Sequence, residues 1–450
     1  MAVLLFFGLA YPHHLHYQEQ FQLFLFDGTY VCDMVKQPGG IADLLGRFCT
    51  QFFLFAWVGA LIIALLLSAV QLLTFRLFTL HFSYGLSFVP SFLLWLFLLD
   101  ENALLGGVWA VLLTLLVACC IVQLTSGWTR RILLIAAIPL LYWAVGPVCF
   151  PIPIDSLWPG IHYHRYPAQF PWLLWGAAFS SFMIVGMALL VRRKVHFSHL
   201  TPLTSYLSFA LVAVVMGYLV WKNANFKAEK VMQYDFMARH QQWNRIIQTI
   251  NDEKPNNQIG VTVQNLALAM HGQLVNHLSD YTQNGIAGLL PDVQSDATSP
   301  LPTAEAFYQL GMIYVAQRTV FEAQEAILDF QKSGRCYKRL AQTNLINGQY
   351  AVARKYLSAL QKTLFYRDWA NETLPLLGDE EAIDRHPEYG RLRQSAYTED
   401  FYFSDHVTSE MLKSLYNRNK DNRLAYQYLL AYYMLTGDRE GYNNFISTQQ

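Results

Sequence analysis

The chain has 450 residues, of which 54% are hydrophobic and 14% are charged, and its mean hydropathy is +0.22. Because a soluble globular protein carries about 25% charged residues, this composition excludes a disordered chain and an ordinary cytosolic enzyme. The 32 basic residues are balanced by 32 acidic residues, so the net charge gives no sign of a polyanionic partner, and we expect no nucleic acid to bind.

Charge is distributed unevenly along the chain. Residues 1–221 hold nine basic and seven acidic residues, whereas residues 222–450 hold 23 basic and 25 acidic ones. A chain of this length is expected to form more than one domain. The change near Trp221 predicts a boundary between a transmembrane domain, 1–221, and a second domain of soluble composition, 222–450.

The first domain contains apolar runs of about the length that a membrane-spanning helix needs, roughly 20 residues. None of them carries a charge in its core or the polar stripe of a helix on a soluble protein, so we interpret them as spans. They are Cys49–Phe75, Tyr84–Leu99, Leu104–Leu124, Ile132–Phe150, Phe170–Val191 and Tyr206–Trp221.

The segment Met1–Tyr11 is also apolar, but it has only about half the length of a span. It lacks the basic leader and the small-residue cleavage site of a signal peptide. We favour the outer half of a first span whose upstream part is missing from the sequence. The alternative is a short helix that enters the membrane partway.

Basic residues in short loops predict the orientation, because such loops stay on the cytosolic side. Arg76, Arg130–Arg131 and Arg192–Lys194 lie in three alternate connections. Seven spans with a cytosolic N-terminus place these connections inside. The outer loops 12–47 and 151–168, and the whole second domain, then lie outside the cytosol.

The first outer loop carries the candidate catalytic acids, Glu19 and Asp27, and a group of histidines. His13, His14 and His16 together with Glu19 have the residue types of a metal site. Histidines at a membrane interface also present a polar tip to lipid headgroups. We favour this second interpretation, which predicts no metal.

Three further segments of this loop predict local structure. Gln18–Phe26 mixes polar and apolar residues, which is typical of a helix on the membrane surface. Pro38–Gly40 breaks the chain, and Ile41–Gly46 begins another short helix that leads into the next span.

The outer loop 151–168 carries the candidate substrate-binding residues Trp158, His162 and Arg165. Its prolines prevent a continuous helix. Trp158 would stack on a sugar or anchor at the interface. Arg165 is the only basic residue of the loop, and it would meet a phosphate or a lipid headgroup.

From Lys222 onward the pattern is that of amphipathic helices with polar breaks. Helix pairs of about 34 residues resemble the tetratricopeptide repeat, in which small residues of two helices pack together. Gly311 with Ala323, and Ala341 with Ala353, share an interval of 12. Such pairs stack into a surface that binds a protein partner, which we favour, or form a rigid lid over the membrane domain.

Glu19 also carries a resemblance to a family of enzymes. Polytopic glycosyltransferases that use polyprenyl-linked sugars, of the GT-C-like type, keep a catalytic or metal-binding acid in the first outer loop, and this chain is similar in layout. The resemblance implies that Glu19 or Asp27 would act in transfer to envelope glycans. The paired acids of that family are absent at Gln18–Gln20.

The whole chain also resembles an uncharacterised bacterial family of polytopic membrane proteins with a tetratricopeptide-like C-terminal domain. The segments that carry this resemblance are Glu19–Phe26, Pro38–Gly40 and Asp43–Gly46. It implies no activity.

The sequence therefore predicts an all-α protein, with a bundle of six or seven spans followed by a tetratricopeptide-like repeat domain. We favour an integral protein of the inner membrane of a Gram-negative bacterium, without enzymatic activity, whose periplasmic repeats hold a cell-envelope protein. The alternative is a lipid-linked sugar transferase, and a neutral-solute transporter ranks third. Nucleotide-binding, zinc-protease and nucleophile-elbow motifs are absent, and we expect no cofactor.

Overall fold

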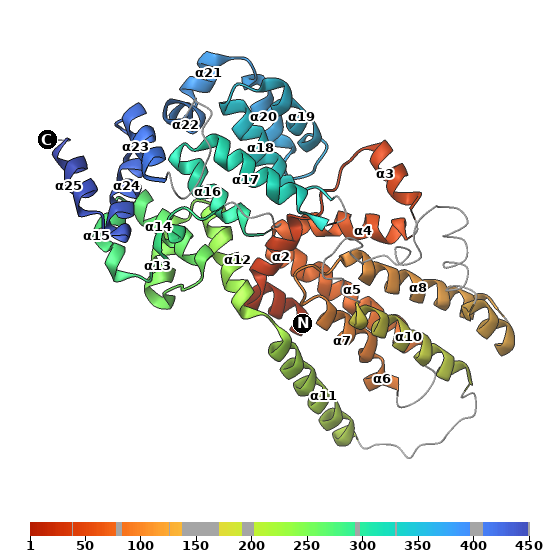
Figure 1. Cartoon of the computed structure of the whole chain (residues 1–450). Helices are drawn as coiled ribbons and strands as arrows, with labels where there is room; N and C mark the ends of the chain where they lie inside the picture. Colours follow the sequence, from red (N-terminus) through yellow and green to blue (C-terminus); the bar gives the residue numbers. More distant parts are fainter. Residues whose placement is uncertain are drawn as a thin grey trace. The chain divides into compact units, whose positions relative to one another are not determined.

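The computed structural model describes residues 1–37, 39–77, 83–125, 127–136, 171–190, 202–292, 298–328, 331–396 and 408–448. Within these ranges the regular structure is helical and no strand is present, which confirms the expected all-α class. The chain divides into two compact units, the N-terminal unit Met1–Glu229 and the C-terminal unit Lys230–Gln450 (Figure 1).

The N-terminal unit is built around α5, which packs against α1, α2, α7, α8 and α10. Its helices are α1 (Ala2–Leu5), η1 (Phe6–Ala10), α2 (Pro12–Glu19), α3 (Gly28–Val35), α4 (Gly40–Thr50), η2 (Gln51–Leu54), α5 (Ala56–Leu77), α6 (Ser83–Leu86), α7 (Phe88–Phe97), α8 (Leu105–Leu124), α10 (Trp172–Leu190) and α11 (Pro202–Asn223). A further helix, α12 (Phe226–Arg239), begins in this unit and continues into the next.

Among the described residues, two helices, α5 and α8, are long and apolar enough to cross a membrane, so the bundle of six or seven spans stays a prediction. Tyr84–Leu99, which the sequence predicts as one span, is divided between α6 and α7. Pro90 lies in the first turn of α7, where its missing N–H costs no helical hydrogen bond. Most of Ile132–Phe150 lies outside the described residues.

The segment between α2 and α3 differs from the surface helix that the sequence predicts. Residues 22–27 have no regular structure. Gln22 and Phe24 are buried and alternate with less buried neighbours, which is the pattern of an extended chain. The segment is therefore extended and not helical, and Phe24 packs with its ring 5.5 Å from that of Phe48. The helix predicted from Ile41 is present as α4.

Helices α4 and α8 approach each other at two glycines. A Cβ atom on Gly46 would lie 2.5 Å from the backbone nitrogen of Gly106, and a Cβ atom on Gly106 would overlap the Asp43 carboxylate. Only residues without a side chain allow two helices to come this close.

The C-terminal unit consists of short helices, most of which pack against their neighbours in sequence. They are α13 (Trp243–Glu253), α14 (Gln258–Met270), α15 (Leu274–His277), η4 (Leu278–Asp280), η5 (Gly285–Gly288), α16 (Pro300–Leu310), α17 (Ile313–Glu325), α18 (Gly334–Ile346), α19 (Tyr350–Leu360), α20 (Arg367–Thr373), η7 (Leu374–Leu376), α21 (Glu380–Arg385), α22 (Tyr389–Ser395), α23 (Thr408–Arg418), α24 (Arg423–Thr436) and α25 (Arg439–Ser447). Helix α24 also packs against α14, α15 and α16, so the end of the chain returns to the start of the unit.

The same turn joins the two helices of four hairpins: α14/α15, α16/α17, α18/α19 and α24/α25. Each turn has a glycine in the left-handed region, with φ of 70 to 93°, and the next residue donates its N–H to a carbonyl five residues earlier, as in Met312 to Phe307 at 2.9 Å. This is the Schellman arrangement that ends a helix. The glycines are Gly272, Gly311, Gly348 and Gly437.

Two of these hairpins repeat the same buried small residues. Ala304 and Ala316 stand seven residues before and five residues after Gly311, and Ala341 and Ala353 occupy the same positions around Gly348. All four alanines are buried. Gly311 itself lies in the turn and not in the first helix, so Gly311 and Ala323 are not the equivalent pair that the sequence spacing indicates.

Candidate functional site

The start of α2, in the first predicted outer loop, is held by a buried carboxylate. Glu229 Oε1 accepts the backbone N–H of His13 at 2.7 Å, and Oε2 accepts that of His14 at 2.9 Å. Pro12 precedes them and has no N–H to satisfy. A negative charge at this end also suits the dipole of the helix, so Glu229 fixes the position where α2 begins.

Two of the three histidines donate to backbone carbonyls. The ring Nε2 of His14 bonds to the carbonyl of Leu98 at 3.0 Å, and the ring Nδ1 of His16 bonds to that of Phe53 at 3.1 Å. A carbonyl only accepts, so each ring nitrogen must carry the proton. These contacts attach α2 to the end of α7 and to η2.

Among the described residues, no three histidine, cysteine or acidic side chains are grouped so as to hold a metal ion. The rings of His14 and His16 are engaged with backbone carbonyls as described. His162 and His164 of the loop 151–168 lie outside the described residues.

Burial shifts the pKa of the two titratable groups at the start of α2 in opposite directions. It lowers the pKa of His14 to about 4 and raises that of Glu229 to about 7, although the bonds from His13 and His14 partly offset the second change. His14 is therefore neutral at pH 7. Its Nδ1 atom is buried and has no hydrogen-bond partner in the described chain.

The two predicted catalytic acids occupy different environments. Glu19 is the last residue of α2 and is only 6% exposed. Asp27 is half-buried and caps α3, because its Oδ1 accepts the N–H of Thr29 at 2.9 Å and that of Tyr30 at 3.4 Å. Asp27 thus has a structural contact of the kind that stabilises a helix start.

The three predicted substrate-binding residues, Trp158, His162 and Arg165, lie outside the described residues. Their role in substrate binding remains a prediction.

In the C-terminal unit, helix α22 covers the first helices of two hairpins, α16 and α18. Tyr308 of α16 donates to Glu388 Oε1 at 3.0 Å, and Arg391 Nη2 donates to Gln309 Oε1 at 3.1 Å. Arg393 Nε donates to the carbonyl of Ile346, at the end of α18, at 3.4 Å. This side of the hairpins is therefore occupied by the chain itself.

The second helix α17 exposes an apolar face with a positive charge. Tyr314 and Phe321 are 46% and 49% exposed, and the exposed Arg318 stands between them. Their spacing of four and three residues puts them on one side of a helix. We call these three residues the α17 outer face. This face was not identified from the sequence. The signal was the helical spacing of its three residues, which alternate with the buried Ala316, Val320 and Ala323.

The segment that contains this face is basic. Residues 313–367 hold nine basic and three acidic residues, whereas residues 368–450 hold eight basic and fourteen acidic ones. Helix α19 exposes Arg354 and Lys355 beside Val352. The positive charge is thus concentrated on the hairpin α18/α19 and the residues next to it, whereas α16 and α17 together hold one basic residue, Arg318, and three acidic ones.

No curated protein and no solved structure matches the chain significantly. A family of unknown function, DUF6057, matches residues 1–450. This agrees with the expected resemblance to an uncharacterised family. Its match covers the whole length, so the chain belongs to the DUF6057 family.

Proposed function

We propose that this protein is an integral membrane protein whose C-terminal unit binds an acidic segment of a cell-envelope protein. The membrane part of the proposal is supported by α5, which is 22 residues long and mostly apolar on the side that the protein leaves uncovered, with exposed Leu61, Leu65 and Leu72 beside one polar residue, Ser68. A helix of a soluble protein would carry polar residues there. Helices α10 and α11, of 19 and 22 residues, have the length of two further spans.

The α17 outer face carries the binding part of the proposal. Large exposed apolar side chains that stand together are typical of protein interfaces. We take the hairpins to be tetratricopeptide-like, as the sequence predicts; α22 packs against their first helices, the side on which such repeats commonly bind peptides. The partner therefore meets the second helices, where Tyr314 and Phe321 supply apolar contacts and Arg318 selects negative charge.

A photo-crosslinking amino acid at position 321, in cells, tests this function. We expect one discrete crosslinked protein, and we expect Arg318→Glu to reduce its amount several-fold because like charges then face each other. The matched control is the crosslinker at Met434 of α24, which is 42% exposed and lies outside the α17 outer face. Equal crosslinking at both positions, or no effect of Arg318→Glu, contradicts the proposal.

The glycosyltransferase alternative is favoured by one observation, the burial of Glu19 at the C-terminal end of α2, where the helix dipole disfavours a negative charge. Because this position destabilises the ionised form of Glu19, a functional role is a reason for the carboxylate to be there. If Glu19 is catalytic, Glu19→Gln abolishes the formation of a surface polysaccharide while the protein level stays normal. Asp33→Asn is the control, since Asp33 is an exposed acid of the same loop, paired with Lys36 on the surface. Unchanged polysaccharide in Glu19→Gln removes this alternative.

A further inference from the structure

Helix α4 buries small residues and exposes large apolar ones. Its buried residues include Ala42 and Gly46, and the helix packs against α8. On its outer side, Ile41 is 57% exposed and Phe48 is 37% exposed. A helix of a soluble protein has the opposite arrangement, with its large apolar residues against the core. Small residues where helices meet, and large ones facing outward, are typical of a protein in lipid.

Aromatic rings surround the exposed Phe48. Its ring lies 5.5 Å from those of Phe24 and Phe52 and 6.4 Å from that of Phe26. Phe26 is 45% exposed, so the extended segment 22–27 adds a second exposed ring next to Phe48. Ile41 stands seven residues before Phe48, on the same side of α4. We call Phe26, Ile41 and Phe48 the α4 apolar surface.

Exposed apolar side chains continue along the chain from this surface into α5. Phe55, which follows η2, is 52% exposed, and Trp57, in the first turn of α5, is 50% exposed. The exposed Leu61 and Leu65 follow Trp57 at intervals of four residues, on one side of the helix. The exposed rings thus precede a helix that has the length and composition of a span. Aromatic side chains gather at such ends in membrane proteins.

The charged residues of this region lie away from the exposed apolar side chains or beside them. Lys36 and Asp33 pair at 3.3 Å and are largely exposed, at the end of α3. The Asp43 carboxylate lies against α8, on the opposite side of α4 from Ile41. Arg47 is half-buried, and a side chain of its length can reach lipid headgroups from the edge of an apolar surface.

We propose that the α4 apolar surface docks onto the lipid bilayer, at the boundary between its hydrocarbon core and its headgroups. The inference rests on the membrane part of the proposed function, because it needs α5 to lie in the bilayer. Lipid fits better than a protein partner, since the exposed apolar character of the surface continues into α5. Docking holds the first predicted outer loop at the membrane, so that it is not free in solution.

Photo-crosslinking to lipid tests this surface. Benzoylphenylalanine, an aromatic photo-crosslinking amino acid, replaces Phe48 in the full-length protein, which is reconstituted in vesicles of phosphatidylethanolamine and phosphatidylglycerol. Mass spectrometry of the intact protein measures the fraction that carries a phospholipid. We expect several-fold more of this adduct at position 48 than at position 36, because Lys36 is an exposed charged residue of the same loop. Position 65 of α5 is the positive control.

The outcomes separate this surface from the membrane part of the proposed function. Adducts at position 65 but not at 48 overturn the surface alone, whereas no adduct at position 65 overturns both. Equal adducts at positions 36 and 48 also overturn the surface. The same holds for a crosslink between two copies of the protein at position 48 in place of lipid. If gel filtration shows that the change at Phe48 prevents folding, replacement of Ile41 decides in its place.

Discussion

At the scale of single residues, His14 and Glu229 make opposing contributions to the pH dependence of stability. The pKa of His14 falls from 6.5 to about 4 on folding, so the unfolded chain binds its proton first and stability is lost as the pH falls from 6.5 toward 4. The pKa of Glu229 rises from 4.5 to about 7, so stability is lost as the pH rises from 4.5 toward 7. Between 4.5 and 6.5 the two effects cancel.

Substitution of either residue removes this cancellation. We expect the thermal midpoint of Glu229→Gln, relative to that of the wild type, to rise with pH between 4.5 and 7, because only the contribution of His14 remains. His14→Gln should show the reverse, a relative midpoint that falls between 4 and 6.5 as Glu229 loses its proton. The measurement is thermal unfolding in detergent across this range. Parallel curves for wild type and variants would contradict the burial of both groups.

At the scale of elements, the contact of α4 with α8 depends on two glycines. We expect Gly46→Ala to lower the free energy of unfolding by about 1–3 kcal/mol, because the new methyl group meets the backbone of Gly106 and the helices must separate. Gly217→Ala is the matched control, since a Cβ atom there meets nothing within 4 Å and alanine favours a helix. Thermal unfolding in detergent measures both. An equal effect of the two changes would place α4 and α8 farther apart.

Local patterns in the sequence predicted many of the helices, but they did not predict which distant segments pack against them. The apolar run Leu104–Leu124 predicts α8 to within one residue, and the glycines of the hairpins mark where first helices end, because these signals are local. The extended segment at Gln22–Phe24 was predicted wrongly, since its conformation depends on burial against Phe48. The cover of α16 by α22 joins residues about 80 positions apart, such as Tyr308 and Glu388, and no local pattern indicates it.

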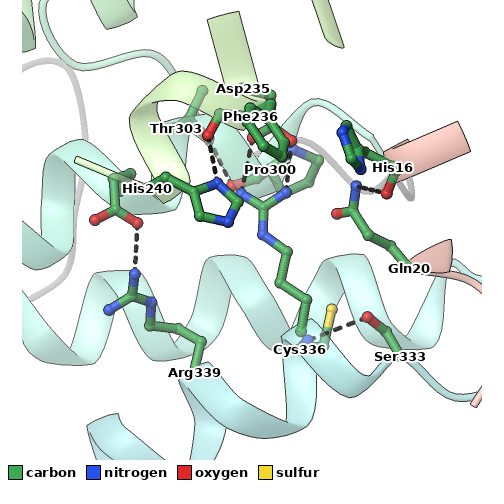
Figure 2. Close-up of polar contacts among 12 residues, drawn as sticks. His16, Gln20, Asp235, Phe236, His240, Pro300, Thr303, Ser333, Cys336 and Arg339 are labelled. Atoms are coloured by element: carbon green, nitrogen blue, oxygen red, sulfur yellow. Dashed lines mark hydrogen bonds and ion pairs between the residues drawn. The ribbon is translucent and has the colours of Figure 1, made fainter. Parts of the chain in front are cut away.

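The candidate sites follow the same division. Asp27 and Glu19 stand out by residue type, but the capping role of Asp27 depends on how the following helix begins. The buried ion pairs Arg335–Asp235 and Arg339–Glu305 join α12, α16 and α18, which lie far apart in sequence (Figure 2). Each of these charges is ordinary on an amphipathic helix, so only the fold reveals how they pair.

At the scale of the whole molecule, the proposed function requires the C-terminal unit to lie outside the cytosol. The basic connections at Arg76, Arg130–Arg131 and Arg192–Lys194 are expected to stay inside. An odd number of crossings after a cytosolic N-terminus then carries Lys230–Gln450 across the membrane. We expect a reporter enzyme that works only in the cytosol to be inactive when it is fused after Gln450, and a reporter that works only in the periplasm to be active there.

A second pair of fusions, in the connection that holds Arg130 and Arg131, provides the control. There the cytosolic reporter should be active and the periplasmic one inactive, which shows that both reporters tolerate fusion to this protein. A working cytosolic reporter after Gln450 would place the α17 outer face in the cytosol. The crosslinked partner would then be a cytosolic protein.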